Sequence, residues 1–232
     1  MNQGSLLLLA GILALTGCTI EKPGPVVNDF RVYERDDAES LRVSLRMGAG
    51  ELRIGSGTQK LLRADFAYNV PSWKPEVVYS NTSRNATLRI EQPSVSKSIG
   101  NTKYEWDLRF NREVPVDLDV NFGAGEATLD LGSLDMRRVD VHMGVGELKL
   151  DLRGQPKRDY NVKIKGGIGE ATVRLPSDVG VWADAQGGIG EISAHGFRKV
   201  DGHYRNASYG HSKYTIRLEV HGGIGSIKLV TD

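Results

Sequence analysis

The sequence lacks several features on which large classes of proteins depend. It contains a single cysteine, Cys18, so an intramolecular disulfide is impossible. Its 30 lysines and arginines are balanced by 29 aspartates and glutamates, which leaves no basic surface for nucleic acid and no acidic tail. Beyond the N-terminal segment, the apolar spacing of an amphipathic helix is also absent. These absences exclude a disulfide scaffold, a nucleic-acid-binding protein and a helical domain.

Motifs for catalysis and metal binding are missing as well. No nucleophile motif is present, and the five histidines are scattered without the spacing of metal ligands. We therefore expect no enzymatic activity and no cofactor or metal. The histidines are His142, His195, His203, His211 and His221.

Near the N-terminus, an uncharged apolar run covers residues 6–15. About ten such residues are too few to span a bilayer but suit the apolar part of a secretion signal. The run leads into the sequence LTGC at residues 15–18, which resembles the lipoprotein box of bacteria, although no lysine or arginine precedes the run. We predict a lipoprotein signal peptide over residues 1–17, lipidation of Cys18 and a lipid-anchored tether over residues 18–25. An ordinary cleaved signal with an incidental cysteine is the alternative.

This N-terminus predicts a protein outside the cytoplasm that is attached to a membrane by its lipid. Thr19 stands where an aspartate is associated with retention in the inner membrane of Gram-negative cells. The outer membrane or the periplasmic face is therefore favoured if the cell is Gram-negative.

Six Gly-x-Gly motifs organise the remainder of the chain. Around Gly146 the apolar residues fall on odd positions up to Val145 and on even positions from Leu148 onwards. Alternation with a period of two predicts a strand with one buried face, and a slip of one residue requires a bend or bulge. Glycine suits such a bend because it tolerates positive φ. We predict glycine corners at Gly48, Gly50, Gly123, Gly125, Gly144, Gly146, Gly167, Gly169, Gly188, Gly190, Gly223 and Gly225.

The spacing of these corners predicts the fold. The glutamates at positions 126, 147, 170 and 191 are 21, 23 and 21 residues apart, a period typical of a solenoid. We predict an all-β protein, a β-solenoid or single-stranded β-helix-like stack of rungs, with a β-sandwich or β-roll as the alternative. The single domain would cover residues 26–232, with an irregular part at 26–120 and regular repeats at 121–232.

A glutamate follows five of the six corners. Stacked rungs would place neighbouring carboxylates roughly 4.8 Å apart, where two charges repel by about 0.9 kcal/mol in water. We expect backbone N–H groups of the corners to offset this repulsion, with a cation-binding line and a catalytic role as alternatives. This predicted carboxylate ladder comprises Glu51, Glu126, Glu147, Glu170 and Glu191.

The glycine motifs do not fit three better-known glycine-rich sites. A dinucleotide fingerprint needs a third glycine and a following helix, and a phosphate-binding loop needs a lysine followed by serine or threonine. Calcium-binding β-rolls carry an aspartate two residues after the last glycine, where Ala171 stands in one repeat.

The last repeat is longer, because residues 196–213 insert a stretch rich in aromatic and basic side chains before the final corner. The end of a solenoid exposes unpaired strand edges that must be covered. We expect this insertion to be a capping hairpin, and a projecting contact loop is the alternative.

Four segments together resemble the toast-rack family of bacterial envelope proteins. They are LRVSLRMGAGEL at 41–52, WKPEV at 73–77, LDVNFGAGEA at 118–127 and GGIGSI at 222–227. The resemblance implies a β-solenoid-like fold outside the cytoplasm and no established reaction.

We therefore expect a lipid-anchored, non-enzymatic envelope protein that acts in structural, scaffolding or sensing interactions, with the membrane and a protein of the envelope as partners. A carbohydrate-binding or carbohydrate-cleaving β-helix is the alternative. It would need a groove that gathers aromatic side chains such as Trp73, Trp106 and Trp182 near two unique carboxylates.

Overall fold

The computed structural model describes residues 20–93, 97–98 and 100–232, and within them almost every regular element is a strand. Thirteen strands form one sheet, and β1 and β7 form a separate two-stranded parallel sheet. The strands and the one short 3-10 helix are β1 (Ile20–Glu21), β2 (Val27–Tyr33), β3 (Ser40–Ser56), β4 (Leu62–Tyr68), η1 (Pro71–Trp73), β5 (Glu76–Thr82), β6 (Asn85–Glu91), β7 (Lys97–Ser98), β8 (Tyr104–Phe110), β9 (Val116–Asp130), β10 (Met136–Asp151), β11 (Tyr160–Leu175), β12 (Gly180–His195), β13 (Phe197–Val200), β14 (His203–Asn206) and β15 (Thr215–Thr231).

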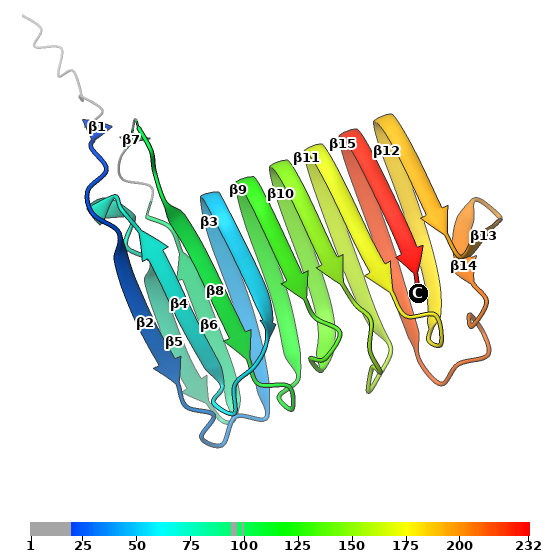
Figure 1. Ribbon diagram of the computed structural model, residues 1–232. Coiled ribbons are helices and arrows are strands. Elements are labelled where there is room, and N and C mark those ends of the chain that lie inside the picture. The colour runs from blue at the N-terminus through cyan, green and yellow to red at the C-terminus, as the bar shows by residue number, and fades with distance from the viewer. Residues whose placement is uncertain (1–19, 94–96, 99) are drawn as a thin grey trace, which may run out of the picture.

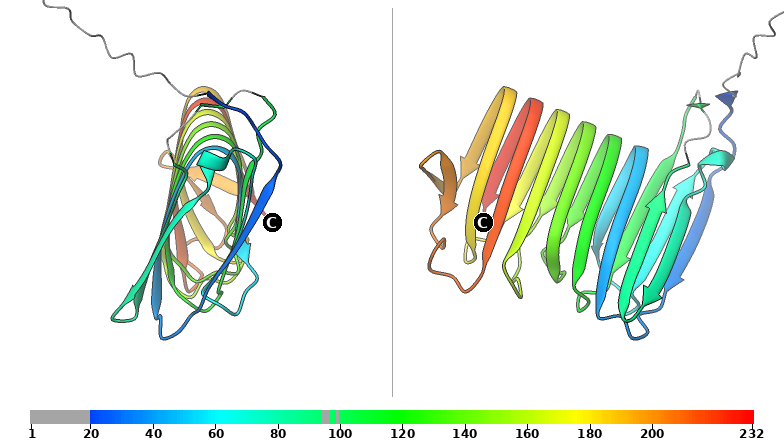
Figure 2. Two further views of the ribbon diagram at one scale, coloured as in Figure 1. Left: turned by 90° about the vertical axis from the view of Figure 1, so that its left-hand side faces the viewer. Right: turned by 180° about the vertical axis from the view of Figure 1, so that it is seen from behind.

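Six strands, β3, β9, β10, β11, β12 and β15, are much longer than the others and contain the glycine corners. Each bends at its corner, so that its two halves run down opposite sides of a narrow arch (Figure 2, left). Neighbouring arches pair in parallel and in register over nearly their whole length. This architecture confirms the predicted β-solenoid-like stack.

The core fills the space between the two sides of each arch. In β10, Val139 and Val141 point inward before the corner and Leu148 and Leu150 after it, all at most 1% exposed. Burying one such aliphatic side chain stabilises the folded protein by roughly 1.5–3 kcal/mol relative to leaving it exposed to water. The alternation also assigned Val145 to this buried face, and that prediction is wrong. Val145 is 49% exposed, because it lies at the bend itself.

The order of the arches differs from their order in the chain. The sheet runs β12-β15-β11-β10-β9-β3, so the C-terminal strand β15 lies between β11 and β12 (Figure 1). The long connection before β15 lets the chain return past β12. Within that connection, β13 and β14 form an antiparallel hairpin, and β14 pairs with β12 at Trp182 and Ala183. The expected capping hairpin is thus confirmed, and it pairs with the first side of the β12 arch.

At the other end of the stack, one rung is divided into two strands. β6, which ends at Glu91, pairs with the first half of β3, and β8, which begins at Tyr104, pairs with its second half, so this rung is not one strand bent at a glycine corner. β4 and β2 extend the β8 side by antiparallel pairing, and β5 extends the β6 side. Large aromatic side chains fill this end, with Phe66, Trp106 and Phe110 at most 2% exposed.

The predicted signal peptide and Cys18 lie outside the described residues. The predicted tether is partly held on the domain, because Ile20 and Glu21 pair with β7 and the Gly24 N–H donates to the Asn69 carbonyl at 2.7 Å. None of the helices in the described part of the chain is both long and apolar enough to cross a bilayer.

Candidate functional site

The bends of the six long strands lie side by side at one end of the molecule. Together they form one continuous convex surface, which we call the arch, whereas each single bent strand is one of the arches that build it. The second glycine of each corner has positive φ, as at Gly146 with φ 135°. A Cβ on Gly146 would lie 1.9 Å from the carbonyl oxygen of Gly125 in the neighbouring strand. The same collision recurs at Gly169 and Gly225, so glycine is required here both for the turn and for the close approach of successive arches.

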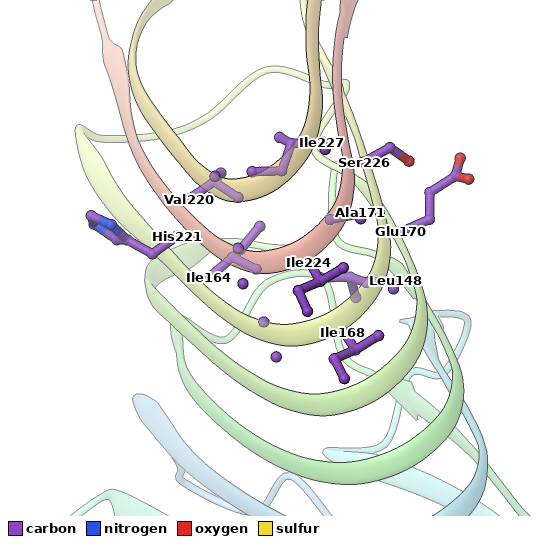
Figure 3. A pocket seen from close by; sticks show the side chains of 18 of the residues that line it. Leu148, Ile164, Ile168, Glu170, Ala171, Val220, His221, Ile224, Ser226 and Ile227 are labelled. Carbon is purple, nitrogen blue, oxygen red and sulfur yellow. The ribbon is translucent and has the colours of Figure 1, made fainter.

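The residue between the two glycines points away from the core. In the order of the stack these residues are Ala49, Ala124, Val145, Ile168, Ile224 and Ile189, each in register with the next. We call this line the crest. Its four larger members are 49% to 71% exposed. Figure 3 shows Ile168 and Ile224 on the outer side of the bend, whereas Ile164, Val220 and Ile227 point into the interior.

The predicted carboxylate ladder runs along one flank of the crest, but its order differs from the prediction. Glu51, Glu126, Glu147 and Glu170 are consecutive partners. Because β15 is inserted before β12, Ser226 separates Glu170 from Glu191, which the sequence had placed as neighbours. Glu105 follows no Gly-x-Gly motif, so the sequence repeat did not mark it. It pairs with Glu51 and adds a carboxylate at that end of the ladder.

The carboxylates are compensated mainly by cationic side chains rather than by the expected backbone N–H groups. Lys149 Nζ lies 2.9 Å from Glu147 Oε1, and Lys228 Nζ lies 2.6 Å from Glu170 Oε1. Arg53 pairs with Glu51 in the same way. The hydrogen bond from Lys228 lowers the pKa of Glu170 below its ordinary value.

These cations alternate with hydroxyl groups on a second line, two residues beyond the carboxylates. Stacked in register, this line reads Arg53, Thr128, Lys149, Thr172, Lys228 and Ser193. A cation on every second arch can lie between two carboxylates, which offsets the repulsion along the ladder.

In one place, at the end of the regular arches, corner N–H groups do have a side-chain acceptor, but it is a glutamine rather than a glutamate. The Gly48 and Ala49 N–H groups both donate to Gln92 Oε1, at 2.7 and 3.3 Å. Gln92 follows β6, whose rung has no glycine corner. The side-chain amide therefore substitutes for the backbone carbonyl that a further arch would have supplied, a role that the repeat pattern did not signal.

The other flank of the crest carries cationic and neutral polar groups beside a groove. Arg46, Asn121, His142, Lys165 and His221 are successive partners on this flank. The groove has a volume of about 820 Å³, and the first four of these residues line it together with Gln92.

A small apolar cavity lies under the arch near β11, β15 and β12 (Figure 3). The inward position just before the corner is Met143 in β10 but glycine in these three strands, at Gly166, Gly222 and Gly187. The cavity measures about 40 Å³, room for a single water molecule and far below the several hundred Å³ of typical ligand pockets.

The three tryptophans of the carbohydrate alternative do not form one groove. Trp106 is fully buried, and Trp73 packs edge-on near it against Tyr104, with ring centroids 5.7 Å apart. Trp182 lies on β12 at the opposite end of the stack, where its ring centroid is 4.6 Å from that of His203. Among the described residues, no group of three or more histidines or carboxylates is arranged to hold a metal ion.

Comparison with known families and structures agrees with this architecture. The profile described as the N-terminal domain of toast_rack, DUF2154, matches residues 22–174, well over half of the chain. The chain belongs to the toast-rack family. The resemblance noted in the sequence is thereby confirmed.

The second half of this toast-rack protein is also similar to another family. The profile for the C-terminal part of LiaF, described as a cell wall-active antibiotics response protein, matches residues 124–229. These residues begin at the corner of β9 and end in β15, so they contain the regular arches and the hairpin.

Solved structures include a protein that is similar over nearly the whole of this chain. A candidate cell adhesion protein from Clostridium sporogenes is 30% identical, with a TM-score of 0.83, over 90% of this chain and 100% of that one. A candidate adhesin from Bacteroides fragilis is 10% identical, with a TM-score of 0.37, over 90% of this chain and 99% of that one. No curated protein matches the chain in sequence.

Proposed function

We propose that this toast-rack protein is a lipid-anchored, non-enzymatic protein of the bacterial cell envelope, which holds a rigid β stack at a membrane surface for contacts with an envelope protein. The observation that carries the proposal is the position of the LTGC segment. Cys18 precedes β1 by only two residues, so a lipid on its side chain would attach the folded domain almost directly to the bilayer.

The comparisons support an envelope role. The similar Clostridium protein is described as a candidate cell adhesion protein, and the LiaF profile concerns a response to antibiotics that act on the cell wall. Both descriptions fit structural or sensing contacts.

The arrangement of acidic side chains supports a non-enzymatic role. Acid–base catalysis requires groups whose environments differ from those of other acids in the same protein. Here the aligned carboxylates recur on successive arches in similar surroundings, and Glu51, Glu147 and Glu170 are each paired with a cation.

The anchor is tested by comparing the wild-type protein with Cys18→Ser and with the matched control Thr16→Ser in the native host. We expect the wild type and the control to incorporate radiolabelled fatty acid and to stay with the membranes after an alkaline wash. Cys18→Ser should incorporate no label and appear in the soluble extracytoplasmic fraction. A Cys18→Ser protein that stays in the washed membranes, together with an unlabelled wild type, would refute the lipid anchor.

A partner is sought by cross-linking intact cells and purifying the acylated protein in detergent. The proposal predicts an envelope protein that is cross-linked to the wild-type stack reproducibly. Recovery of the acylated protein alone under these conditions would contradict the scaffolding part of the proposal.

A further inference from the structure

The N-terminal segment leaves the domain at the end formed by the arch. Val27 pairs with Tyr68, and Tyr68 pairs with Tyr104. The Tyr104 carbonyl oxygen lies 2.2 Å from the position that a Cβ on Gly50 would occupy, which puts all three residues at the level of the glycine corners. β1 lies at this end of the molecule, and the turns between successive arches lie at the opposite end (Figures 1 and 2).

Chain geometry then limits how far the bilayer can be from the arch. An extended residue spans at most about 3.6 Å, so the two steps from Ile20 back to Cys18 reach no further than about 7 Å. A bilayer that holds a lipid on Cys18 must therefore pass close to β1, and the arch is the end of the domain next to it.

The arch has the chemistry of a surface that contacts lipid. Its crest exposes Val145, Ile168, Ile224 and Ile189 in one line, with Ile189 71% exposed. Interfacial segments combine such apolar groups with lysine and arginine that reach lipid phosphates. Arg46 and Lys165 lie along the groove flank of the crest, and no ion pair within the described residues involves Lys165.

The two flanks of the crest differ in charge, and this difference determines which flank the domain tilts toward an anionic bilayer. The groove flank presents Arg46, His142, Lys165 and His221. The other flank presents the carboxylate ladder, in which three of the glutamates are paired with Arg53, Lys149 and Lys228. Near Arg46 the carboxylate of Glu91 lies 3.5 Å away. Three further acidic side chains lie on the groove side, each two residues before a member of the flank, and each has a partner. Asn121 donates a hydrogen bond to Asp119, and Arg138 and Lys163 form ion pairs with Asp140 and Glu219. An anionic surface therefore favours the groove flank over the ladder flank, where Glu126 and Glu191 have no ion pair among the described residues and leave an excess of negative charge.

We propose that the arch is a membrane-contacting surface, on which the crest enters the headgroup region of an anionic bilayer and Arg46 and Lys165 bind lipid phosphates. This inference rests on the proposed lipidation of Cys18 and adds the orientation of the domain. A second copy fits the crest less well, because a ridge one residue wide cannot supply the roughly 800 Å² per partner of a standard protein interface.

The orientation is tested on purified acylated protein in vesicles of phosphatidylethanolamine and phosphatidylglycerol. An acylated Cys18 has no free thiol, so Ile189→Cys supplies a unique one for an environment-sensitive fluorophore. The matched control is Val32→Cys. Val32 is 41% exposed, and its pairing through Arg63 and Arg109 places it level with Gly55, near the end of the sheet opposite the arch.

Brominated phospholipids should quench the fluorophore at position 189 several-fold more than the one at position 32. The difference should shrink when phosphatidylcholine replaces phosphatidylglycerol, and also in the double variant Arg46→Glu, Lys165→Glu with an unchanged circular dichroism spectrum. Equal quenching at both positions would overturn the inference, as would self-quenching at position 189 between copies. Mass spectrometry of the same sample separates the two proposals, because a missing acyl mass would refute the anchor and the orientation with it.

Discussion

The glycine corners make a quantitative prediction, because two glycines of the same strand differ both in backbone conformation and in what surrounds them. In β11, a Cβ on Gly169 would lie 1.8 Å from the Gly146 carbonyl oxygen, 1.2 Å inside the 3.0 Å that real Cβ contacts respect, and the residue has φ 144°. The backbone at Gly169 and the backbone at Gly146 cannot move apart without separating the paired strands β11 and β10. A Cβ on Gly166 would meet no heavy atom within 4 Å.

For Gly169→Ala, the strain of an unfavourable φ costs about 1–3 kcal/mol, and forced separation of the strands costs about 1–3 kcal/mol more. We therefore expect a loss of about 2–6 kcal/mol in the free energy of unfolding, a large part of the 5–15 kcal/mol typical of a domain. Gly166→Ala should change it by less than about 1 kcal/mol, and in the stabilising direction.

Urea denaturation followed by circular dichroism measures both variants. Amide hydrogen exchange should accompany it, because stacked repeats can open in parts and the loss at Gly169 should be concentrated in β10, β11 and β15. Equal stability of the two variants, or greater damage from Gly166→Ala, would refute the close-packed arch.

Three further predictions concern the cap, the core and the ladder. Asn206→Ala should cost about 1–3 kcal/mol and speed proteolysis within residues 196–213, because its buried amide serves three backbone groups of the loop before β12 and of β12 itself. Leu150→Ala should cost about 2–5 kcal/mol in denaturant unfolding, whereas the neighbouring Lys149→Ala should cost under about 0.5 kcal/mol. NMR titration should place the pKa of Glu170 below its ordinary value in the wild type and nearer to it in Lys228→Met. Since the folded-state pKa is the lower one, the contact favours folding at neutral pH and loses its effect as the pH falls through that pKa.

The outcomes that would contradict these predictions are specific. Unchanged protease resistance in Asn206→Ala would mean that the hairpin is held by other contacts. Equal losses in Leu150→Ala and Lys149→Ala would contradict the inward orientation of the leucine. An unchanged Glu170 pKa in Lys228→Met would show that the cation line does not compensate the ladder.

Much of the fold could be predicted from the sequence because its decisive interactions repeat locally. Alternation around Gly146 identifies two strand halves, and the slip at the corner identifies the bend, whatever strand lies next to it. The insertion at 196–213 was predicted as a hairpin on similar grounds, since its place at the end of the repeats implied an exposed edge to cover.

The candidate site was harder to predict because it depends on neighbours and on curvature. Val145 continues the apolar alternation in the sequence, but it lies on the convex side of the bend, where an odd position no longer faces the core. The crest was therefore missed. Gln92 and Glu105 were missed because they belong to the divided rung, which has no corner motif to mark them.

By itself, then, the sequence determined the arches, their glycine bends and their apolar interior, because each follows from the pattern within one strand. Only the tertiary structure decided the order of the stack. All regular arches carry nearly the same pattern and pair in the same register, so their patterns do not distinguish one neighbour from another. The connection of 19 residues between β12 and β15, about half of it the β13–β14 hairpin, lets β15 enter the sheet between β12 and β11, which sets Ser226 between Glu170 and Glu191.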